Sequence, residues 1–360
     1  MEAARFDYHL PKEAIAQVPA DRRDQSRLLL VNRSTGQVAD HFFRELPDLL
    51  PRPARFFRNN VKVMKGRIFA TRQGGGQVEC LLLHPASELP LTDWWCLLKP
   101  GKRLPVGSEF SREGLFRAAV IAKRDDGMVH VRFALEKHDS VTAMAEDAGE
   151  MPLPPYINRS TDDERKELDE ERYQTVYADP NKPFAAAAPT AGLHFTPEII
   201  NRLIEGGNHF HDLTLHVGMG TFKPIQSDLV ESHLMHEEHY ELPAASRSAL
   251  HEKDSTIKLA VGTTSLRAME HYFRQSRRNP SQPDGPYVNN ADLYIYPPES
   301  FTTDALLTNF HLPRSTLLCL VSAFLTPGST DGIDWLIQVY QAALKRNYRF
   351  YSYGDAMLIL

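Results

Sequence analysis

The sequence predicts an α/β core, a mixed or largely parallel sheet with flanking helices, that carries an inserted small β-barrel domain. Between Arg67 and about Leu135 the chain has short strand-like runs separated by turn residues, whereas after Asp163 strands and helices alternate. The length of 360 residues also exceeds what one ordinary hydrophobic core serves. We therefore expect a core formed by residues 1–63 and 150–360, and a barrel domain at residues 64–149.

The barrel elements are predicted from apolar runs bounded by turn residues. Turns are expected at Gly74-Gly75-Gly76, Pro100-Gly101 and Asp126-Gly127. The expected strands cover residues 78–83, 94–98, 115–121 and 128–133. The acidic, proline-rich stretch 140–163 is typical of a linker back to the core.

The second half contains strand-to-helix junctions. Thr196, Pro197 and Glu198 begin a helix as its N-cap, first residue and early acid, and Gly206-Gly207 ends it. Residues 213–217 and 257–261 alternate as strands, and a last amphipathic helix is expected near residues 333–340. Such βα units predict a largely parallel sheet.

Composition excludes several classes of protein. The formal charge of −5 argues against a protein that coats nucleic acid through bulk positive charge, although Lys99, Lys102 and Arg103, or Arg274, Arg277 and Arg278, could form a local basic face. The three cysteines lie far apart, so we expect reduced, packed thiols. No apolar run has the length of a membrane span or a signal peptide, which predicts a cytoplasmic protein.

The junction Gly262-Thr263-Thr264-Ser265 is a candidate anion site. A strand that becomes a helix here presents backbone N–H groups and hydroxyls at the positive end of the helix dipole. Thr and Ser are also ordinary N-cap residues, and this alternative stays open. Arg267, one turn into the helix, favours an anion.

Two histidines stand beside glycine-rich loops at βα junctions. His194 follows Gly192, and His216 precedes Gly218 and Gly220. Ligands of open α/β sheets collect at the carboxyl ends of strands, so both are candidate acid/base groups, although a lone histidine is usually only packed.

The spacing of His233, His236 and His239 raises the question of a metal site. Neither a helix nor a strand aims residues at this spacing toward one ion, and no HExxH pattern is present. We therefore expect no metal site, and interpret His236 and Glu238 as possible acid/base partners.

A series of motifs extends over nearly the whole chain. In order they are FDY at 6–8, SRL at 26–28, PPYI at 154–157, RYQTVYA at 172–178, AAPTAGLHF at 187–195, LHVGMGTF at 215–222, HLMH at 233–236, VGTTSLR at 261–267, TNFHLPRSTL at 308–317 and YRFYSYGDAML at 348–358. Together they resemble the S-adenosylmethionine:tRNA ribosyltransferase-isomerases of queuosine biosynthesis. The resemblance implies transfer and isomerisation of the ribosyl part of S-adenosylmethionine onto 7-aminomethyl-7-deazaguanine at the tRNA wobble position, with release of adenine and methionine.

The resemblance also implies a set of site residues. The candidate catalytic residues are His194, His216, His236 and Glu238. The candidates for binding S-adenosylmethionine are Thr190, Gly192, Gly218, Gly220, Thr221, Thr263, Thr264, Ser265 and Arg267. The candidates for binding the tRNA anticodon stem-loop are Arg27, Asn59, Lys62, Asn309 and His311. S-adenosylmethionine is then a co-substrate, no cofactor is expected to be tightly bound, and a monomer is expected.

Two departures from the family pattern leave alternative functions open. Asn60-Val61 stands where the family has Asp-Thr, and Pro297-Pro298 where it has Pro-Gly. An amide cannot replace a carboxylate in proton transfer. The alternatives are a catalytically weakened relative that binds S-adenosylmethionine or tRNA, and a histidine-ligated metallohydrolase.

Overall fold

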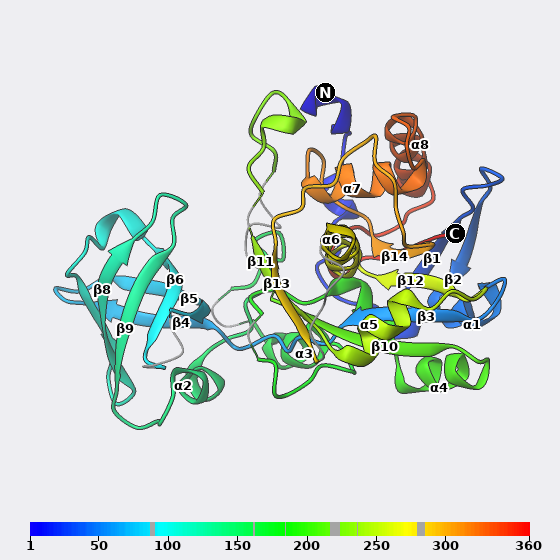
Figure 1. The fold of residues 1–360 in the computed structure, drawn as a ribbon. Helices are drawn as coiled ribbons and strands as arrows, with labels where there is room; N and C mark the ends of the chain where they lie inside the picture. Colours follow the sequence, from blue (N-terminus) through cyan, green and yellow to red (C-terminus); the bar gives the residue numbers. More distant parts are fainter. Residues whose placement is uncertain (87–90, 161–162, 184, 217–223, 236, 279–284) are drawn as a thin grey trace.

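The computed structural model describes residues 1–86, 91–160, 163–183, 185–216, 224–235, 237–278 and 285–360. Within these ranges the strands form a nine-stranded sheet and, beside it, a closed six-stranded barrel (Figure 1). This confirms the predicted fold class of an α/β core with an inserted β-barrel. Among the described helices, none is both long and apolar enough to cross a bilayer.

The large sheet is mixed. Its strand order is β13 (Tyr287–Ala291), β11 (Glu238–Leu242), β10 (His209–Leu215), β3 (Ala54–Asn59), β12 (Ile257–Val261), β14 (Ala305–Asn309), β15 (Ala356–Ile359), β1 (Arg27–Val31) and β2 (Val38–Phe42). Strands β10, β3, β12 and β14 run parallel, as do β15 and β1, while the remaining neighbours are antiparallel. The sheet therefore has a parallel centre, as predicted, with antiparallel strands at both edges.

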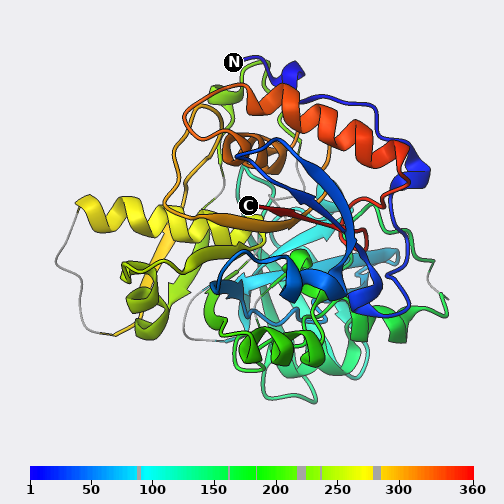
Figure 2. The ribbon, with the colours of Figure 1, turned by 90° about the vertical axis from the view of Figure 1, so that its right-hand side faces the viewer.

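Both faces of the sheet are covered, which explains its continuous apolar strands. Neighbouring side chains alternate between the faces, so Phe57 and Phe56 belong to two different buried clusters. The first face packs against α5 (Ala244–His251), α6 (Thr263–Arg278), α7 (Thr316–Leu325) and α8 (Gly332–Lys345). The second packs against α1 (Leu46–Leu49) and α4 (Pro197–Glu205). In Figure 2 the orange-red helices α7 and α8 and the green α4 lie on opposite sides of the sheet.

The barrel strands are antiparallel and follow the order β4-β5-β6-β9-β8-β7. Their bounds are β4 (Arg67–Arg72), β5 (Gln77–Pro85), β6 (Asp93–Lys99), β7 (Glu109–Arg112), β8 (Phe116–Lys123) and β9 (Val129–Leu135). Cys80 and Cys96 are buried free thiols inside the barrel, and Cys319 is a buried free thiol in α7, as expected.

The stretch after the barrel is not a simple linker, which corrects the expectation for residues 140–163. Ser140 caps a helix, α2 (Val141–Ala148), through a hydrogen bond from Ala143 N. Val141, Met144 and Ala145 recur at helical spacing and join the buried cluster of the barrel. The local apolar period thus outweighs the linker-like composition.

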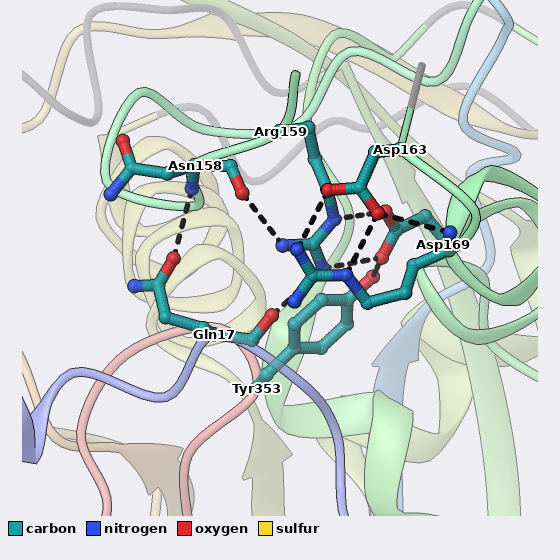
Figure 3. Close-up of polar contacts among 7 residues, drawn as sticks. Gln17, Asn158, Arg159, Asp163, Asp169 and Tyr353 are labelled. Carbon is teal, nitrogen blue, oxygen red and sulfur yellow. Dashed lines mark hydrogen bonds and ion pairs between the residues drawn. The ribbon is translucent and has the colours of Figure 1, made fainter. Parts of the chain in front are cut away.

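A buried ion pair ties the next segment to both ends of the chain (Figure 3). Arg159 Nε contacts Asp169 Oδ2 at 2.6 Å, with the side chains 6% and 3% exposed. Arg159 Nη2 also donates to the carbonyl of Gln17 at 2.7 Å, and the hydroxyl of Tyr353 donates to Asp169 Oδ1 at 2.8 Å. Asp169 belongs to α3 (Lys166–Arg172), so this helix is fixed against the N-terminal and C-terminal segments.

Short 3-10 helices complete the described elements. They are η1 (Ala3–Phe6), η2 (Lys12–Ala14), η3 (Arg23–Gln25), η4 (Phe43–Glu45), η5 (Gly101–Arg103), η6 (Thr190–His194) and η8 (Val230–Ser232).

We propose that residues 64–149 fold as a separate domain, because Met64 and Ala145 both belong to the buried barrel cluster. Gly149→Ala tests this at the junction. A Cβ at Gly149 would lie 1.8 Å from the carbonyl oxygen of Lys65, so the change forces the end of α2 and the segment at Lys65 apart at this junction and destabilises the barrel domain by about 1–3 kcal/mol. Amide hydrogen exchange is expected to accelerate in the barrel strands and α2 while the nine-stranded sheet keeps its protection.

Gly101→Ala is the matched control, because a Cβ there meets no atom within 4 Å. It should leave exchange unchanged. Equal loss of protection in the barrel and in the large sheet of the Gly149 variant would show one cooperative unit and contradict the domain boundary.

Candidate active site

Several functional groups gather where the parallel strands end. The carboxyl ends of strands β10, β3, β12 and β14 lie side by side, and β15 and β1 begin beside them. We call this line of strand ends the carboxyl edge, which is distinct from the outer strands of the sheet. Ligands of open α/β sheets bind at such an edge. The barrel leaves the core from the same edge, because β3 ends at Asn59 and the first barrel strand begins at Arg67 (Figure 1).

A pocket at this edge has a cavity volume of about 70 Å³ and opens to solvent, and it spans about 670 Å³ when the solvent at its mouth is included. Its lining comes from the loop 187–191, the start of α6, the end of β14 and the turn at residues 351–352. Five predicted site residues line it: Thr190, Thr263, Thr264, Asn309 and His311. The structure thus brings together residues that lie more than a hundred positions apart.

His194 lies behind this pocket in a chain of hydrogen bonds. Its Nδ1 is 2.7 Å from the hydroxyl of Ser26, which donates its own proton to the carbonyl of Arg23. Nδ1 therefore carries the imidazole proton. Nε2 accepts from the amide of Asn309 at 3.1 Å, and Asn309 Oδ1 accepts from the hydroxyl of Thr190 at 2.9 Å.

This environment keeps the imidazole neutral. Burial, together with the positive charges of Arg349, Arg23 and Arg172, lowers the pKa of His194 to about 3. With both nitrogens engaged, the ring is suited to fixing its neighbours rather than to carrying a proton. His311 is also neutral, because burial lowers its pKa to about 3, and its Nε2 lies 2.9 Å from the hydroxyl of Thr308.

The start of α6 presents an anion-binding geometry to the pocket. Gly262 has a φ of +90°, which favours glycine, and its N–H donates to the carbonyl of Leu307 at 2.7 Å. The helix then begins, so Thr263 and Thr264 meet the pocket at the positive end of its dipole. Ser265 is fully buried, and its hydroxyl has no hydrogen-bond partner among the described residues.

Arg267 lies with Glu238 rather than among the described lining of the pocket. The two side chains, each 5% exposed, form a buried ion pair between α6 and β11. Burial lowers the pKa of Arg267 to about 10, so it remains cationic at neutral pH. The pair lies near the edge where the strands end, but its charges are directed at each other.

His216 also lies at this edge. Its backbone N–H donates to the carbonyl of His239 at 3.0 Å, and the two rings stack with centroids 5.6 Å apart. The predicted residues Gly218, Gly220, Thr221 and His236 lie outside the described part of the chain. Within that part, no three His, Cys, Asp or Glu side chains are arranged to hold a metal ion.

Two predicted residues have a packing role. A Cβ at Gly192 would lie 2.0 Å from the hydroxyl oxygen of Tyr177, so a larger residue there would displace the Tyr177 side chain. Asn59 joins the ends of β3 and β10, since its Nδ2 donates to the carbonyl of Leu215 and its Oδ1 accepts from the N–H of that residue.

Two predicted tRNA contacts are occupied by other partners. Arg27 lies over the ring of Tyr348 at 3.8 Å and donates to Asp40. Lys62 forms an ion pair with Glu146 of α2 at 3.0 Å. Both side chains remain partly exposed, at 30% and 32%.

The departure at Asn60 is accommodated by a local hydrogen bond. Asn60 Oδ1 accepts from the hydroxyl of Thr214 at 2.8 Å, an interaction that an aspartate would also make. Val61 is fully buried beside it. The substituted pair therefore fits the core at the end of β3.

Several residues at the site have contacts that the sequence does not predict. Ser26 binds His194, while Asp355 accepts from the N–H groups of Arg27 and Arg349 and so fixes the start of β1. Tyr156 and Tyr351 line the pocket. All lie in motifs quoted above, but nothing in their local pattern predicts their contacts.

Comparisons with known proteins show the family of the chain. A family described as "Queuosine biosynthesis protein" matches residues 3–359. The S-adenosylmethionine:tRNA ribosyltransferase-isomerase of Thermotoga maritima is 41% identical over 363 residues and that of Carboxydothermus hydrogenoformans 39% identical over 364, each covering 100% of both chains. The crystal structure of S-adenosylmethionine tRNA ribosyltransferase from Thermotoga maritima is also similar, with 34% identity and a TM-score of 0.53. The match covers 99% of this chain and 100% of the chain in that crystal structure. The chain therefore belongs to the S-adenosylmethionine:tRNA ribosyltransferase-isomerase family of queuosine biosynthesis.

Proposed function

We propose that the pocket at the carboxyl edge binds S-adenosylmethionine and transfers its ribosyl part, with isomerisation, onto 7-aminomethyl-7-deazaguanine at the tRNA wobble position. The products are epoxyqueuosine in tRNA, adenine and methionine. The observation that carries this proposal is that Thr190, Thr263, Thr264, Asn309 and His311, all in motifs of the family pattern, line one pocket.

The reaction needs groups that hold the methionine carboxylate, remove a proton beside the sulfonium and help adenine leave. We assign the carboxylate to the start of α6, where Thr263 and Thr264 offer hydroxyls and N–H groups. We assign His194 to positioning Asn309 and Thr190, because both of its nitrogens are engaged. His216, His236 and Glu238 remain the candidates for proton transfer.

The RNA partner in this proposal is an anticodon stem-loop with the modified base unstacked. Sequence-specific RNA recognition targets single-stranded loops, where base edges and faces are accessible. S-adenosylmethionine is the co-substrate, and no cofactor or metal has a role. We place the enzyme in the cytoplasm as a monomer, since its substrate is tRNA and one chain supplies the described lining of the pocket.

We expect the purified protein to release adenine and methionine in equal amounts from S-adenosylmethionine and an anticodon stem-loop that carries the aminomethyl-deazaguanine base. Chromatographic quantification of both products is the measurement. A stem-loop with unmodified guanine is the control, since it lacks the nucleophilic amine.

A fully paired RNA should not be a substrate, and a metal chelator should leave the rate unchanged. Loss of turnover on chelation, restored by a divalent metal, would instead favour the histidine-ligated metallohydrolase.

The neutrality of His194 predicts a pH dependence of stability. Its folded-state pKa of about 3 lies below its ordinary value of 6.5, so the unfolded chain takes up the proton first on acidification. Above pH 7, His194 adds no pH dependence to the free energy of unfolding. By pH 5, protonation of His194 in the unfolded chain lowers the free energy of unfolding by about 2 kcal/mol. His194→Gln should remove that loss, measured by denaturant unfolding at pH 7 and pH 5.

His84→Gln is the control, because His84 is exposed on the barrel and its ring forms a hydrogen bond with the carbonyl of Pro85. Its variant should lose stability on acidification as the wild type does. An acid sensitivity of His194→Gln equal to that of the wild type would show that the imidazole is not held neutral.

The departure at residues 60 and 61 gives a separate test. Because Asn60 keeps the hydrogen bond from Thr214, we expect the wild type to turn over and the double change Asn60→Asp with Val61→Thr to alter only the rate. Adenine release is the measurement. Background release by the wild type together with clear release by the double variant would identify this chain as a binding relative.

A further inference from the structure

Tyr351 is a bulky residue in an unusual backbone conformation at the pocket. Its φ is +71°, in the left-handed region that side chains other than those of glycine, asparagine and aspartate rarely adopt. It lines the pocket and is 6% exposed. Such conformations persist only where the surroundings determine them, and they cluster at functional sites.

The surrounding turn holds this conformation in place. The N–H of Tyr351 donates to the carbonyl of Phe310 at 3.2 Å, and the N–H of Gly354 donates to the carbonyl of Tyr351 at 2.9 Å. The turn is so tight that a Cβ at Gly354 would lie 2.4 Å from the carbonyl oxygen of Arg349. The ring of Tyr351 is therefore fixed relative to the end of β14.

The side chain of Tyr351 combines a stacked ring with an unused donor. Its ring lies against that of Tyr156, with centroids 4.2 Å apart, and the hydroxyl of Tyr156 is 2.5 Å from that of Ser352. The hydroxyl of Tyr351 is buried and has no hydrogen-bond partner among the described residues. A buried donor without a partner is costly and needs an explanation, and here a ligand in the pocket that Tyr351 lines would satisfy it.

The same pocket also offers groups that could bind an anion. Thr263 and Thr264 meet it at the positive end of α6, which suits a carboxylate. A ligand that fills it therefore needs an anionic group and a flat ring with an acceptor atom. S-adenosylmethionine has both, in its methionine carboxylate and its adenine.

We infer that the hydroxyl of Tyr351 donates a hydrogen bond to a ring nitrogen of the adenine of S-adenosylmethionine. This rests on the proposed function. As the glycosidic C–N bond breaks, its electron pair leaves the ribosyl carbon and stays on adenine, and the hydrogen bond stabilises the negative charge that builds there. Adenine then leaves as the neutral base by taking up the proton that was removed beside the sulfonium. Tyr351 keeps its proton in this step.

The test is calorimetric binding of S-adenosylmethionine, without RNA, to the full chain and to Tyr351→Phe. The variant keeps the ring and loses only the hydroxyl, so affinity should fall about three- to tenfold, as for one hydrogen bond. Affinity for the anticodon stem-loop should be unchanged. Tyr272→Phe is the control, since Tyr272 is buried, its hydroxyl lies 2.9 Å from His251 Nε2, and neither residue is among the described residues of the pocket lining.

Analogues of S-adenosylmethionine in which N1, N3 or N7 of adenine is replaced by C–H locate the acceptor. The wild type should bind one of them more weakly, and Tyr351→Phe should lose nothing further with that analogue. An equal loss with all three overturns the assignment, as does weaker RNA binding with unchanged affinity for S-adenosylmethionine. Because binding is measured without turnover, a protein that binds as expected but releases no adenine refutes the proposed function and not the role of Tyr351.

Discussion

The hydrogen bonds on the two ring nitrogens of His194 join three segments that are far apart in sequence. Ser26 precedes β1, His194 ends η6 and Asn309 ends β14. A buried imidazole whose nitrogens lack hydrogen-bond partners is unfavourable, so the folded protein keeps both hydrogen bonds. These hydrogen bonds hold the three segments at fixed distances from the ring. The pocket depends on this arrangement, because Thr190 and Asn309 form part of its wall.

The ion pair between Arg159 and Asp169 fixes a second part of the chain around the pocket. Through the hydroxyl of Tyr353 it reaches the turn that contains Tyr351, and through the carbonyl of Gln17 it reaches the N-terminal segment (Figure 3). Breaking a buried pair by removing one partner costs about 3–5 kcal/mol, since it leaves an unpaired charge. One side of the pocket is thus fixed by charge and the other by a neutral hydrogen-bond chain.

The sequence predicted the fold well where local pattern decides structure. Alternating runs and turn residues located strands β5, β6, β8 and β9, and an N-cap with a following proline located α4. The prediction of a linker at α2 was wrong, because it rested on nearby acids and prolines. The helical spacing of three apolar residues there determines the structure instead. The antiparallel edges of the large sheet depend on pairing between distant strands, which periodicity does not reveal.

The site was predictable to the extent that strand ends and motifs indicate it. Thr190, Thr263, Thr264, Asn309 and His311 do line one pocket. The charge of Arg267 could not reveal its partner, because Glu238 lies on another strand. The left-handed conformation of Tyr351 is imposed by tertiary contacts and leaves no mark in local sequence.

A crystal structure of this protein with S-adenosylmethionine bound would test most directly whether the pocket at the carboxyl edge is the substrate site. We expect the methionine carboxylate at the first turn of α6 and the adenine beside Tyr156 and Tyr351. Density for S-adenosylmethionine at another site, with this pocket empty, would contradict the assignment of the pocket and of the residues that line it.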